Sequence, residues 1–387
     1  MARHRQIRLC REGVYYTVVF LAVLIGAVSR QLNLLMLLGC TLGGPLLFSL
    51  IYGHFALRRL RVERKLPTHL YVDQRLKVDV TVRNGRRLLA VWAIQVNDHV
   101  EHENAAASQA AGAGVFFPRV SAGESRQTSY EGRLPRRGRY RFGPLRVSTR
   151  FPIGLVRHSL VLDDSAELLV HPKLGRLSPG WAKLIREHEA GSHRVSRRGL
   201  LEADFYGLRE WRPGDSRRWI HWRTSARKGS LIVRQFEQRR SQNLAVLVDL
   251  WQPADPTDDE LAHVETAVSF VATLIADACR KPGGQLVLDL AAQELMHLSG
   301  PATPLFFREQ MDALALVQAH RDDVFPNSLG HALALVPAST PTLVISTRPL
   351  DWDAFREAAA ERDAQLAGRK LEAVNVAGDE LNRYFQS

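Results

Sequence analysis

Two uncharged apolar runs open the chain, over residues 14–28 and 32–57. A helix that crosses a membrane needs about 20 apolar residues. The second run provides this length, and the first provides it once its flanking residues are counted. Because the link around Arg30 is only long enough for a tight turn, the pattern predicts a transmembrane helical hairpin, with helices over about 14–29 and 32–57.

Two details of this region leave alternatives open. The small residues in Ala27-Val28-Ser29 also fit the cleavage site of a signal peptide. A second apolar run follows at once, which favours the hairpin, because a mature soluble domain does not begin with such a run. Gly43-Gly44-Pro45 permits either a kink in the second helix or close packing against the first.

Residues 66–170 show the period-two alternation of half-buried strands. In "RLKVDVTVRN" the apolar residues share one face of a strand: Leu76, Val78, Val80 and Val82. Asn84-Gly85 then ends that strand in a turn. Further segments of this kind follow without a helical period. They predict an antiparallel β-sandwich of immunoglobulin-like size over residues 66–190, with a flexible loop at 102–114.

The last third of the chain alternates buried strands with helices. The continuous apolar stretches are 243–250, 285–291, 340–347 and 371–377, and the helical stretches are 258–280, 304–319 and 351–367. This alternation predicts an α/β domain over residues 241–387 whose parallel sheet carries helices on both faces. Ligands bind such sheets at the carboxyl ends of strands, where Asp249 lies.

The stretch "GLREWRPGDSRRWIHWRTSARKGSLIVRQF" (207–236) combines three tryptophans with eight arginine or lysine residues. Pro213-Gly214 predicts a turn. Asp215 or Ser216 is placed to cap a helix over 217–228, which Gly229 ends. A strand follows over 230–236.

The apolar positions of that helix predict how it packs. Trp219, Trp222 and Ala226 are spaced i, i+3 and i+7, so they form one stripe. We therefore expect Trp219 and Trp222 to be buried at the junction of the two domains. We also expect Arg209 or Arg218 to lie within salt-bridge distance of a carboxylate.

The charge of the chain changes sign directly after this stretch. The net charge is +12 overall, with +8 in residues 1–65, +7 in 66–193, +8 in 194–240 and −11 in 244–387. The reversal predicts a domain boundary near residue 241. The predicted organisation is a membrane hairpin with basic flanks (1–65), the β-sandwich (66–190), a linking segment (191–240) and the α/β domain (241–387).

Basic residues flank both ends of the hairpin, whereas its turn holds only Arg30. By the positive-inside rule, both ends face the cytoplasm. We expect a multi-pass protein of a bacterial inner membrane with its soluble domains in the cytoplasm. Cys10, Cys40 and Cys279 form no spaced motif, so they encode neither a zinc site nor a disulfide framework.

Three functions compete for residues 207–236. Asp215, Ser216 and His221 invite a catalytic triad, but three residues of one cap and one short helix would point around its circumference. Arginines interleaved with tryptophans suit phosphate contacts and base stacking in nucleic-acid binding. The third interpretation is structural and interactive, with arginines paired to carboxylates. It best explains a basic segment beside an acidic domain, and we prefer it.

The same stretch resembles the signature of the bacterial domain-of-unknown-function 58 family. The resemblance rests on Gly207-Leu208-Arg209-Glu210, Pro213-Gly214-Asp215, Arg218-Trp219-Ile220-His221-Trp222 and Ala226-Arg227. "RRGRYRFGPLRVSTRFPIGL" (136–155) resembles a second motif of the family. The chain departs from the signature at Trp211, where tyrosine is usual, and at His221, where aspartate is usual.

The resemblance implies an architecture and partners. It implies a von Willebrand A-like fold for the last domain, a MoxR-type AAA+ ATPase as partner and a transglutaminase-like membrane protein as neighbour. It implies no reaction, because no enzymatic activity is established for the family. The expected function is therefore a membrane-anchored, non-catalytic adaptor in assembly or envelope maintenance. The alternative is binding of a nucleic acid or another anionic ligand through the basic segment.

The residues expected to carry the interaction all lie in or beside the signature. They are Arg209, Glu210, Pro213, Gly214, Asp215, Arg218, Trp219, His221, Trp222, Arg227 and Arg234.

A von Willebrand A domain often binds a divalent metal through Asp-x-Ser-x-Ser after its first strand. Here Asp249 is followed by Trp251 and Pro253 at the serine positions, and neither side chain ligates a hard cation. We therefore expect a degenerate site with no metal and no cofactor. The acids at 255–260 are expected to be helix-start residues favoured by the macrodipole; a repurposed metal site is the other interpretation.

Overall fold

A computed structural model of the chain describes residues 3–104, 111–184, 204–213, 215–237, 243–280, 283–322, 336, 340–349, 371–378 and 380–386. The chain divides into two compact units, an N-terminal unit over Met1–His171 and a C-terminal unit over Pro172–Ser387. This division is coarser than the four-part organisation predicted above.

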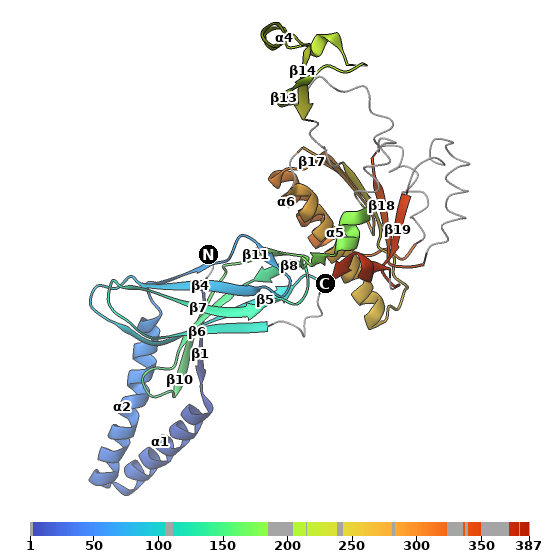
Figure 1. Cartoon of the computed structure of the whole chain (residues 1–387). Helices are drawn as coiled ribbons and strands as arrows, with labels where there is room; N and C mark the ends of the chain where they lie inside the picture. Colours follow the sequence, from blue (N-terminus) through green and yellow to red (C-terminus); the bar gives the residue numbers. More distant parts are fainter. Residues whose placement is uncertain are drawn as a thin grey trace. The chain divides into compact units, whose positions relative to one another are not determined.

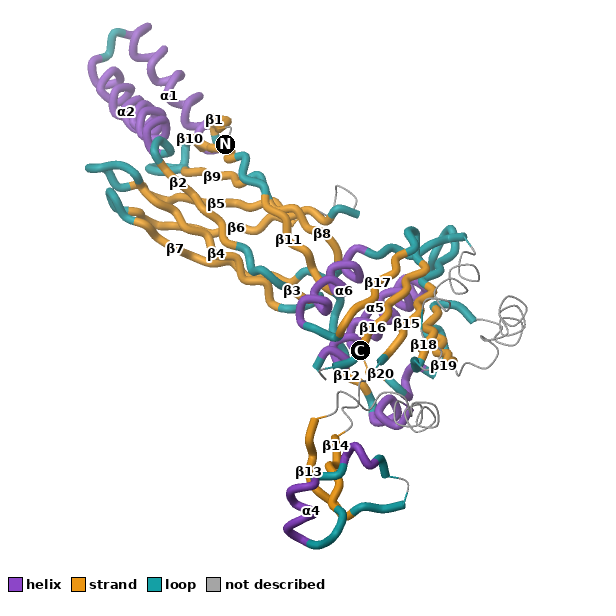
Figure 2. The backbone as a smooth tube through the Cα atoms, turned by 90° about the horizontal axis from the view of Figure 1, so that it is seen from above, coloured by secondary structure: helices purple, strands orange, loops and turns teal. Residues whose placement is uncertain are grey.

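The two apolar runs form an antiparallel helical hairpin (Figures 1 and 2). Helices α1 (Arg11–Arg30) and α2 (Asn33–Ala56) are long and apolar enough to cross a membrane. The hydroxyl of Tyr16 on α1 donates to the carbonyl of Leu42 on α2. A Cβ at Gly43 would lie 3.0 Å from the ring of Phe20. This glycine therefore permits close packing of the two helices.

Strands of the N-terminal unit flank the hairpin on both sides. Strand β1 (Arg3–Leu9), which the sequence patterns did not predict, pairs antiparallel with β10 (Val156–Leu162). Strand β2 (Leu60–Lys65) follows α2 and pairs with β4 (Arg75–Asn84). Both ends of the hairpin thus return to one folded body.

The β-strands of the N-terminal unit form two sheets (Figure 2). The larger runs β1-β10-β9-β5-β8-β11-β3, with β6 paired to β5, and the smaller runs β2-β4-β7. Their remaining bounds are β3 (Leu70–Tyr71), β5 (Val91–His102), β6 (Ala111–Val120), β7 (Ser125–Arg133), β8 (Gly138–Phe142), β9 (Leu145–Thr149) and β11 (Ala166–His171). All pairings are antiparallel except β11 with β3.

Both sheets contribute to one hydrophobic core. The face predicted from the alternation in β4 is buried, with Val78, Val80 and Val82 at 0% exposure, and Ile94 and Val96 of β5 belong to the same cluster. The loop predicted over 102–114 is shorter than expected, because β6 already begins at Ala111. Its residues 105–110 lie outside the described part of the chain.

A buried ion pair joins the two sheets. Arg64 of β2 donates to Asp98 of β5 at 2.7 Å, and both side chains are 1% exposed. The other carboxylate oxygen accepts from the hydroxyl of Tyr130 on β7 at 2.7 Å. Arg64 also donates to the carbonyls of Phe142 and Asp164. It is therefore no free cation of the membrane flank, although the sequence placed it there.

The C-terminal unit contains a five-stranded sheet in the order β17-β16-β15-β18-β19. The four predicted strands are present and mutually parallel as β15 (Leu244–Asp249), β16 (Gln285–Ala291), β18 (Thr342–Ser346) and β19 (Leu371–Asn375). An unpredicted antiparallel edge strand, β17 (Met296–Pro301), lies beside β16. All six residues of β15 are buried.

Two of the three predicted helices of this unit lie in the described residues, as α5 (Asp258–Cys279) and α6 (Pro304–Leu316). The helix predicted at 351–367 lies outside them. Helix α5 also has the length and composition of a membrane span, but half of its residues are buried in the unit. A short pair, β12 (Arg176–Leu177) with β20 (Phe385–Gln386), joins the two ends of the unit.

Candidate functional site

The signature lies on a small hairpin, which we call the β13–β14 module (residues 204–237). Strand β13 (Asp204–Glu210) pairs antiparallel with β14 (Ile232–Glu237). Between them lie a 3-10 turn, η2 (Arg217–Trp219), and a short helix, α4 (Trp222–Lys228). The prediction of one helix over 217–228 was wrong, because Ile220 is extended and forms a β-bridge with Val233.

The caps of α4 differ in part from those predicted. His221, and neither Asp215 nor Ser216, is the N-cap, and its Nδ1 accepts from the backbone N–H of Thr224 at 3.3 Å. Ser216 instead accepts from the N–H of Arg218 and begins the 3-10 turn. Gly229 ends the helix in the left-handed conformation at φ 69°, as predicted.

A bidentate ion pair closes the turn after β13. Arg209 donates from both terminal nitrogens to the two oxygens of Asp215 at 2.7 Å each. The backbone N–H of Arg212 donates to the same carboxylate at 2.8 Å. The guanidinium and then this N–H hold the pKa of Asp215 at about 2. The predicted contact between Arg209 and a carboxylate is confirmed.

The structure gives each of the triad candidates a local structural partner. Asp215 holds Arg209, Ser216 begins a 3-10 turn and His221 caps α4. Within the described residues of the module, no hydrogen bond joins any two of these three side chains. The arrangement is that of a braced turn.

The tryptophans do not form the predicted buried stripe. Trp222 is 66% exposed, Trp219 is half-buried and Ala226 is exposed. The buried positions of the module are instead Ile220, Ser225, Ile232 and Val233. Because the predicted helix is interrupted, the i, i+3, i+7 spacing no longer places the tryptophans on one face.

Ser225 is the anchor that the sequence patterns missed. Its hydroxyl accepts from the N–H of Ile232 at 2.8 Å and lies within hydrogen-bond distance of the carbonyl of His221. The N–H of His221 donates to the carbonyl of Ile232 at 2.8 Å. These bonds attach α4 to β14, so the position of Trp222 on the module is fixed. A serine four residues after a helix cap carries no distinctive sequence signal.

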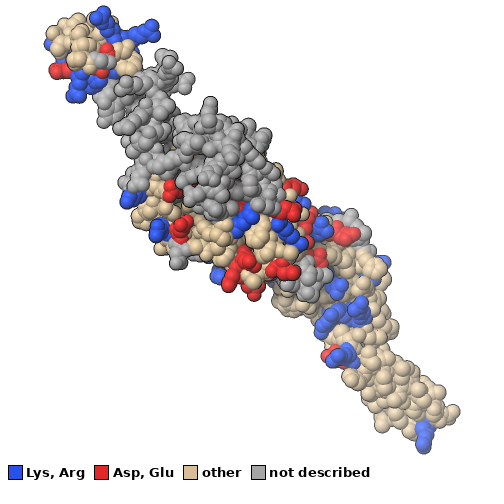
Figure 3. Space-filling model, turned by 90° about the vertical axis from the view of Figure 1, so that its right-hand side faces the viewer, with Lys and Arg blue, Asp and Glu red and all other residues tan. Residues whose placement is uncertain are grey.

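The module that carries the exposed tryptophan also exposes many cations. Figure 3 shows lysine and arginine side chains gathered on its surface, and the exposed ones are Arg212, Arg217, Arg218, Arg223, Arg227, Lys228 and Arg234. Of the other predicted interaction residues, Glu210 and Pro213 are exposed and Gly214 lies outside the described residues.

At the carboxyl end of β15, Asp249 is fully buried and held by three side chains. Its Oδ1 lies 2.8 Å from Nε2 of His320, and its Oδ2 accepts from Ser346 and Arg348 at 3.0 Å each. The guanidinium of Arg348 lies 5.4 Å above the ring of Trp251. Arg348 therefore supplies a positive charge to this buried carboxylate.

The acids that follow are helix-start residues. Thr257 and Glu260 form a capping box at the start of α5, and Asp258 and Asp259 lie in its first turn. Pro253 is partly exposed. Across the described residues, no group of three or more His, Cys, Asp or Glu side chains is arranged to hold a metal ion.

Comparison with known proteins identifies the signature. Residues 207–303 match the model of the family described as "Protein of unknown function DUF58". A curated relative, "Uncharacterized protein YeaD" of Bacillus subtilis (strain 168), is 28% identical over 211 residues, which are 52% of this chain and 51% of the relative. The chain thus matches about half the length of that relative.

Some solved structures are similar to parts of the chain. The CARDB domain of a Pyrococcus furiosus protein, in complex with di-metal ions, has a TM-score of 0.19 at 15% identity and covers 29% of this chain and 91% of its own. The sporulation control protein Spo0M of Bacillus subtilis has a TM-score of 0.19 at 12% identity. The match covers 40% of this chain and 58% of Spo0M.

Replacing Arg209 tests the ion pair of the module. In Arg209→Gln we expect the pKa of Asp215 to rise from about 2 toward its ordinary value of about 3.9. The pKa of Asp215 is lower in the folded protein than in the unfolded chain, so the ion pair stabilises the module above about pH 3.9. This stabilisation is lost as the pH falls through about 2. Carbon-13 NMR titration of labelled aspartate measures the shift. Arg227→Gln is the control, and equal pKa values in both variants would contradict the assignment.

Replacing Asp249 tests the buried cluster. Asp249→Ala leaves the charge of Arg348 without its carboxylate, so we expect a loss of about 3–5 kcal/mol in the free energy of unfolding. Chemical denaturation of the full-length chain in detergent measures it. Asp255→Ala, at an exposed acid of the same region, should change stability by less than about 0.5 kcal/mol. A similar loss in both variants, or a rise in melting temperature with Mg²⁺, would contradict the interpretation.

Proposed function

This chain belongs to the DUF58 family, and from that premise we propose that it is a membrane-anchored, non-catalytic adaptor that acts through protein–protein contacts. The observation that carries the proposal is the exposure of Trp222 on a helix fixed by Ser225 and His221. Tryptophan and arginine dominate interface hot spots. A tryptophan held in place on a module rich in exposed arginine fits such a surface.

The anchor in this proposal is the α1–α2 hairpin. Because β1 and β2 both belong to the N-terminal unit, the two ends of the hairpin lie on the same side of a membrane. Arg58, Arg59 and Arg61 are exposed directly after α2, whereas the turn holds Arg30. The positive-inside rule then favours the cytoplasmic side of a bacterial inner membrane for both units.

The proposed partner is a MoxR-type AAA+ ATPase, with a transglutaminase-like membrane protein as a neighbour. Both come from the family resemblance and not from a contact in the structure. The acidic C-terminal region and the basic module offer surfaces of opposite charge, which favour specific orientation in a complex. Assembly or envelope maintenance is the process that this partnership implies.

The absence of catalysis is also a proposal. Its support is that Asp215, Ser216 and His221 are each engaged in local structure. We also propose a β-sandwich for the two sheets of the N-terminal unit and a von Willebrand A-like fold for the C-terminal unit. The parallel strands β16, β15, β18 and β19 support the latter.

A second candidate is favoured by the same exposed tryptophan. Trp222, on the same module as the exposed Arg218, Arg223 and Arg227, would suit base stacking with phosphate contacts. This function requires binding of single-stranded DNA or RNA that weakens steeply with salt. No binding to the full-length chain at low salt would reject it. Because Trp219 is half-buried, Trp222 is the one exposed tryptophan among the described residues of the module. Several bases could not stack on a row of exposed rings, so we rank this function second.

Replacing Trp222 tests the adaptor surface. Trp222→Ala should weaken capture of the AAA+ ATPase by about 30-fold or more, because hot-spot residues contribute about 2 kcal/mol or more. Affinity purification of the tagged full-length chain from detergent extract, with quantification of the ATPase, measures the change.

The matched control is Leu295→Ala, another exposed apolar residue of the C-terminal unit, at 58% exposure. It should leave capture unchanged. Equal capture by both variants would reject the module as the docking surface. If wild-type protein captures no AAA+ ATPase, the proposed partner itself is wrong.

Cysteine labelling tests the orientation of the hairpin. In a chain whose native cysteines are replaced by serine, Gln31→Cys in the turn should react with an impermeant maleimide in intact spheroplasts. Asn104→Cys in the N-terminal unit should react only after lysis. Both positions are exposed, so accessibility in the protein does not limit the reaction. The reverse pattern would place the units outside the cytoplasm.

A further inference from the structure

The turn between β4 and β5 (residues 85–90) is attached to the end of α2. Gly85 donates its N–H to the carbonyl of Arg59 at 3.0 Å. The guanidinium of Arg86 donates to the carbonyls of Phe55 and Arg58 at the C-terminal end of the helix and just after it. The turn therefore lies at the level at which the proposed membrane helix leaves the bilayer.

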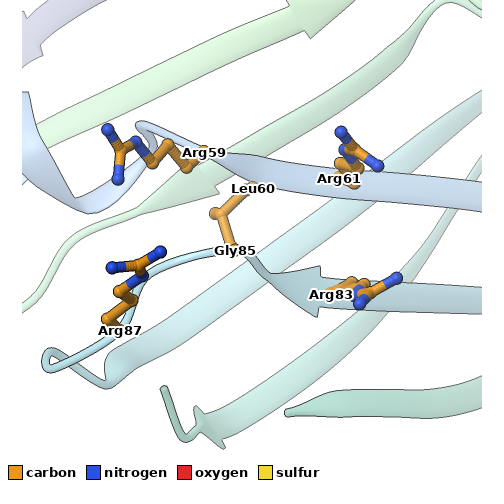
Figure 4. A pocket seen from close by; sticks show the side chains of 6 residues that line it. All are labelled: Arg59, Leu60, Arg61, Arg83, Gly85 and Arg87. Atoms are coloured by element: carbon orange, nitrogen blue, oxygen red, sulfur yellow. The ribbon is translucent and has the colours of Figure 1, made fainter. Parts of the chain in front are cut away.

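Four arginines line a pocket at this point. The pocket has a volume of about 570 Å³ and is lined by Arg59, Leu60, Arg61, Arg83, Gly85 and Arg87 (Figure 4). Arg61 and Arg83 are direct partners across the β2–β4 ladder. Like charges in such positions destabilise a sheet. Within the described residues, no carboxylate forms a salt bridge with any of the four arginines.

A second pair of arginines, at the other end of β4, has a carboxylate that offsets the repulsion between like charges. There Arg75 is the ladder partner of Arg133, but Arg75 also lies 3.5 Å from Glu131. The pair beside α2 has no such internal counterion. A pocket of uncompensated guanidinium groups is typical of a site for a phosphate-bearing anion.

Exposed leucines adjoin the pocket. Leu88 is 92% exposed and Leu89 is 62% exposed. Their turn is braced by the buried Asn84, whose side chain donates to the carbonyl of Leu89 and accepts from the N–H of Arg86. The turn thus holds two large apolar side chains in solvent next to a basic pocket, a combination suited to the boundary between headgroups and acyl chains.

An aromatic cluster marks the same level. Tyr52, one turn before the end of α2, accepts from the N–H of Trp92 and lies 5.0 Å from the ring of Phe151. Trp92 stacks on Phe151 at 6.0 Å. Tryptophan and tyrosine are enriched where a membrane meets water. Three independent features therefore place the arginine pocket at the membrane surface.

We propose that the pocket of Arg59, Arg61, Arg83 and Arg87 binds the phosphate of an anionic phospholipid, with Leu88 and Leu89 inserted among the acyl chains. The inference rests on the proposed membrane anchoring of α1 and α2. A free phosphate ion would share the arginine chemistry, but it gives the leucines no role. The bound lipid supplies the counterion that the Arg61–Arg83 pair lacks.

The test uses the full-length chain in detergent micelles. Phosphatidylglycerol, phosphatidylcholine and inorganic phosphate are titrated separately, and native mass spectrometry measures the bound ligand. Wild-type protein should bind phosphatidylglycerol in preference to the other two. The double variant Arg61→Gln/Arg83→Gln should bind it about 30-fold more weakly, at about fivefold for each arginine near a membrane surface.

The control is Arg75→Gln/Arg133→Gln, which removes the same charge from the far end of β4. This variant should bind phosphatidylglycerol as tightly as the wild type does.

The variant Leu88→Ser/Leu89→Ser should bind phosphatidylglycerol more weakly and should bind inorganic phosphate as the wild type does. Equal binding by the two arginine variants, each with an unchanged melting temperature, would overturn the proposal. Phosphate binding as tight as lipid binding would overturn the lipid assignment. No partner protein is present, so these outcomes are independent of the adaptor test.

Discussion

The buried ion pair between Arg64 and Asp98 is the interaction on which the part of the N-terminal unit next to α2 depends. Arg64 lies on the strand that begins directly after α2, and Asp98 lies in the larger sheet. Two charges at 1% exposure are tolerable only when paired and hydrogen-bonded. Tyr130 and two backbone carbonyls complete that requirement. The pair thereby fixes how the end of the hairpin meets both sheets and where the arginine pocket forms.

Regular hydrophobic patterns explain which elements the sequence could predict. The long apolar runs specified α1 and α2, the alternation around Val78 and Val80 specified β4, and the all-apolar stretch at 244–249 specified a buried strand. Strand β1 escaped detection because this edge strand exposes most of its side chains. Its residues therefore carry no clear period, since Arg5, Ile7 and Arg8 are all exposed.

The candidate site was harder to predict, because its geometry depends on single contacts. Periodicity assumed an unbroken helix, but the extended residue Ile220 divides it and turns Trp222 outward. His221 is the cap because α4 begins only at Trp222, after the extended Ile220, and Asp215 is instead bound to Arg209. The environment of Asp249 joins residues 71 to 99 positions apart, a separation at which local patterns hold no information. The bidentate use of Arg209 was foreseeable from the chemistry of guanidinium groups.

Strand β1 imposes an order of events during synthesis. Its partner β10 ends at Leu162, so the first strand of the chain stays unpaired while the hairpin and most of the N-terminal unit are made. Long-range strand pairing of this kind is slow, because loop closure must precede any gain from contacts. The ribosome therefore delivers both apolar helices before β10 is made. The strand that precedes the helical hairpin is joined to the sheet only after the hairpin itself is complete.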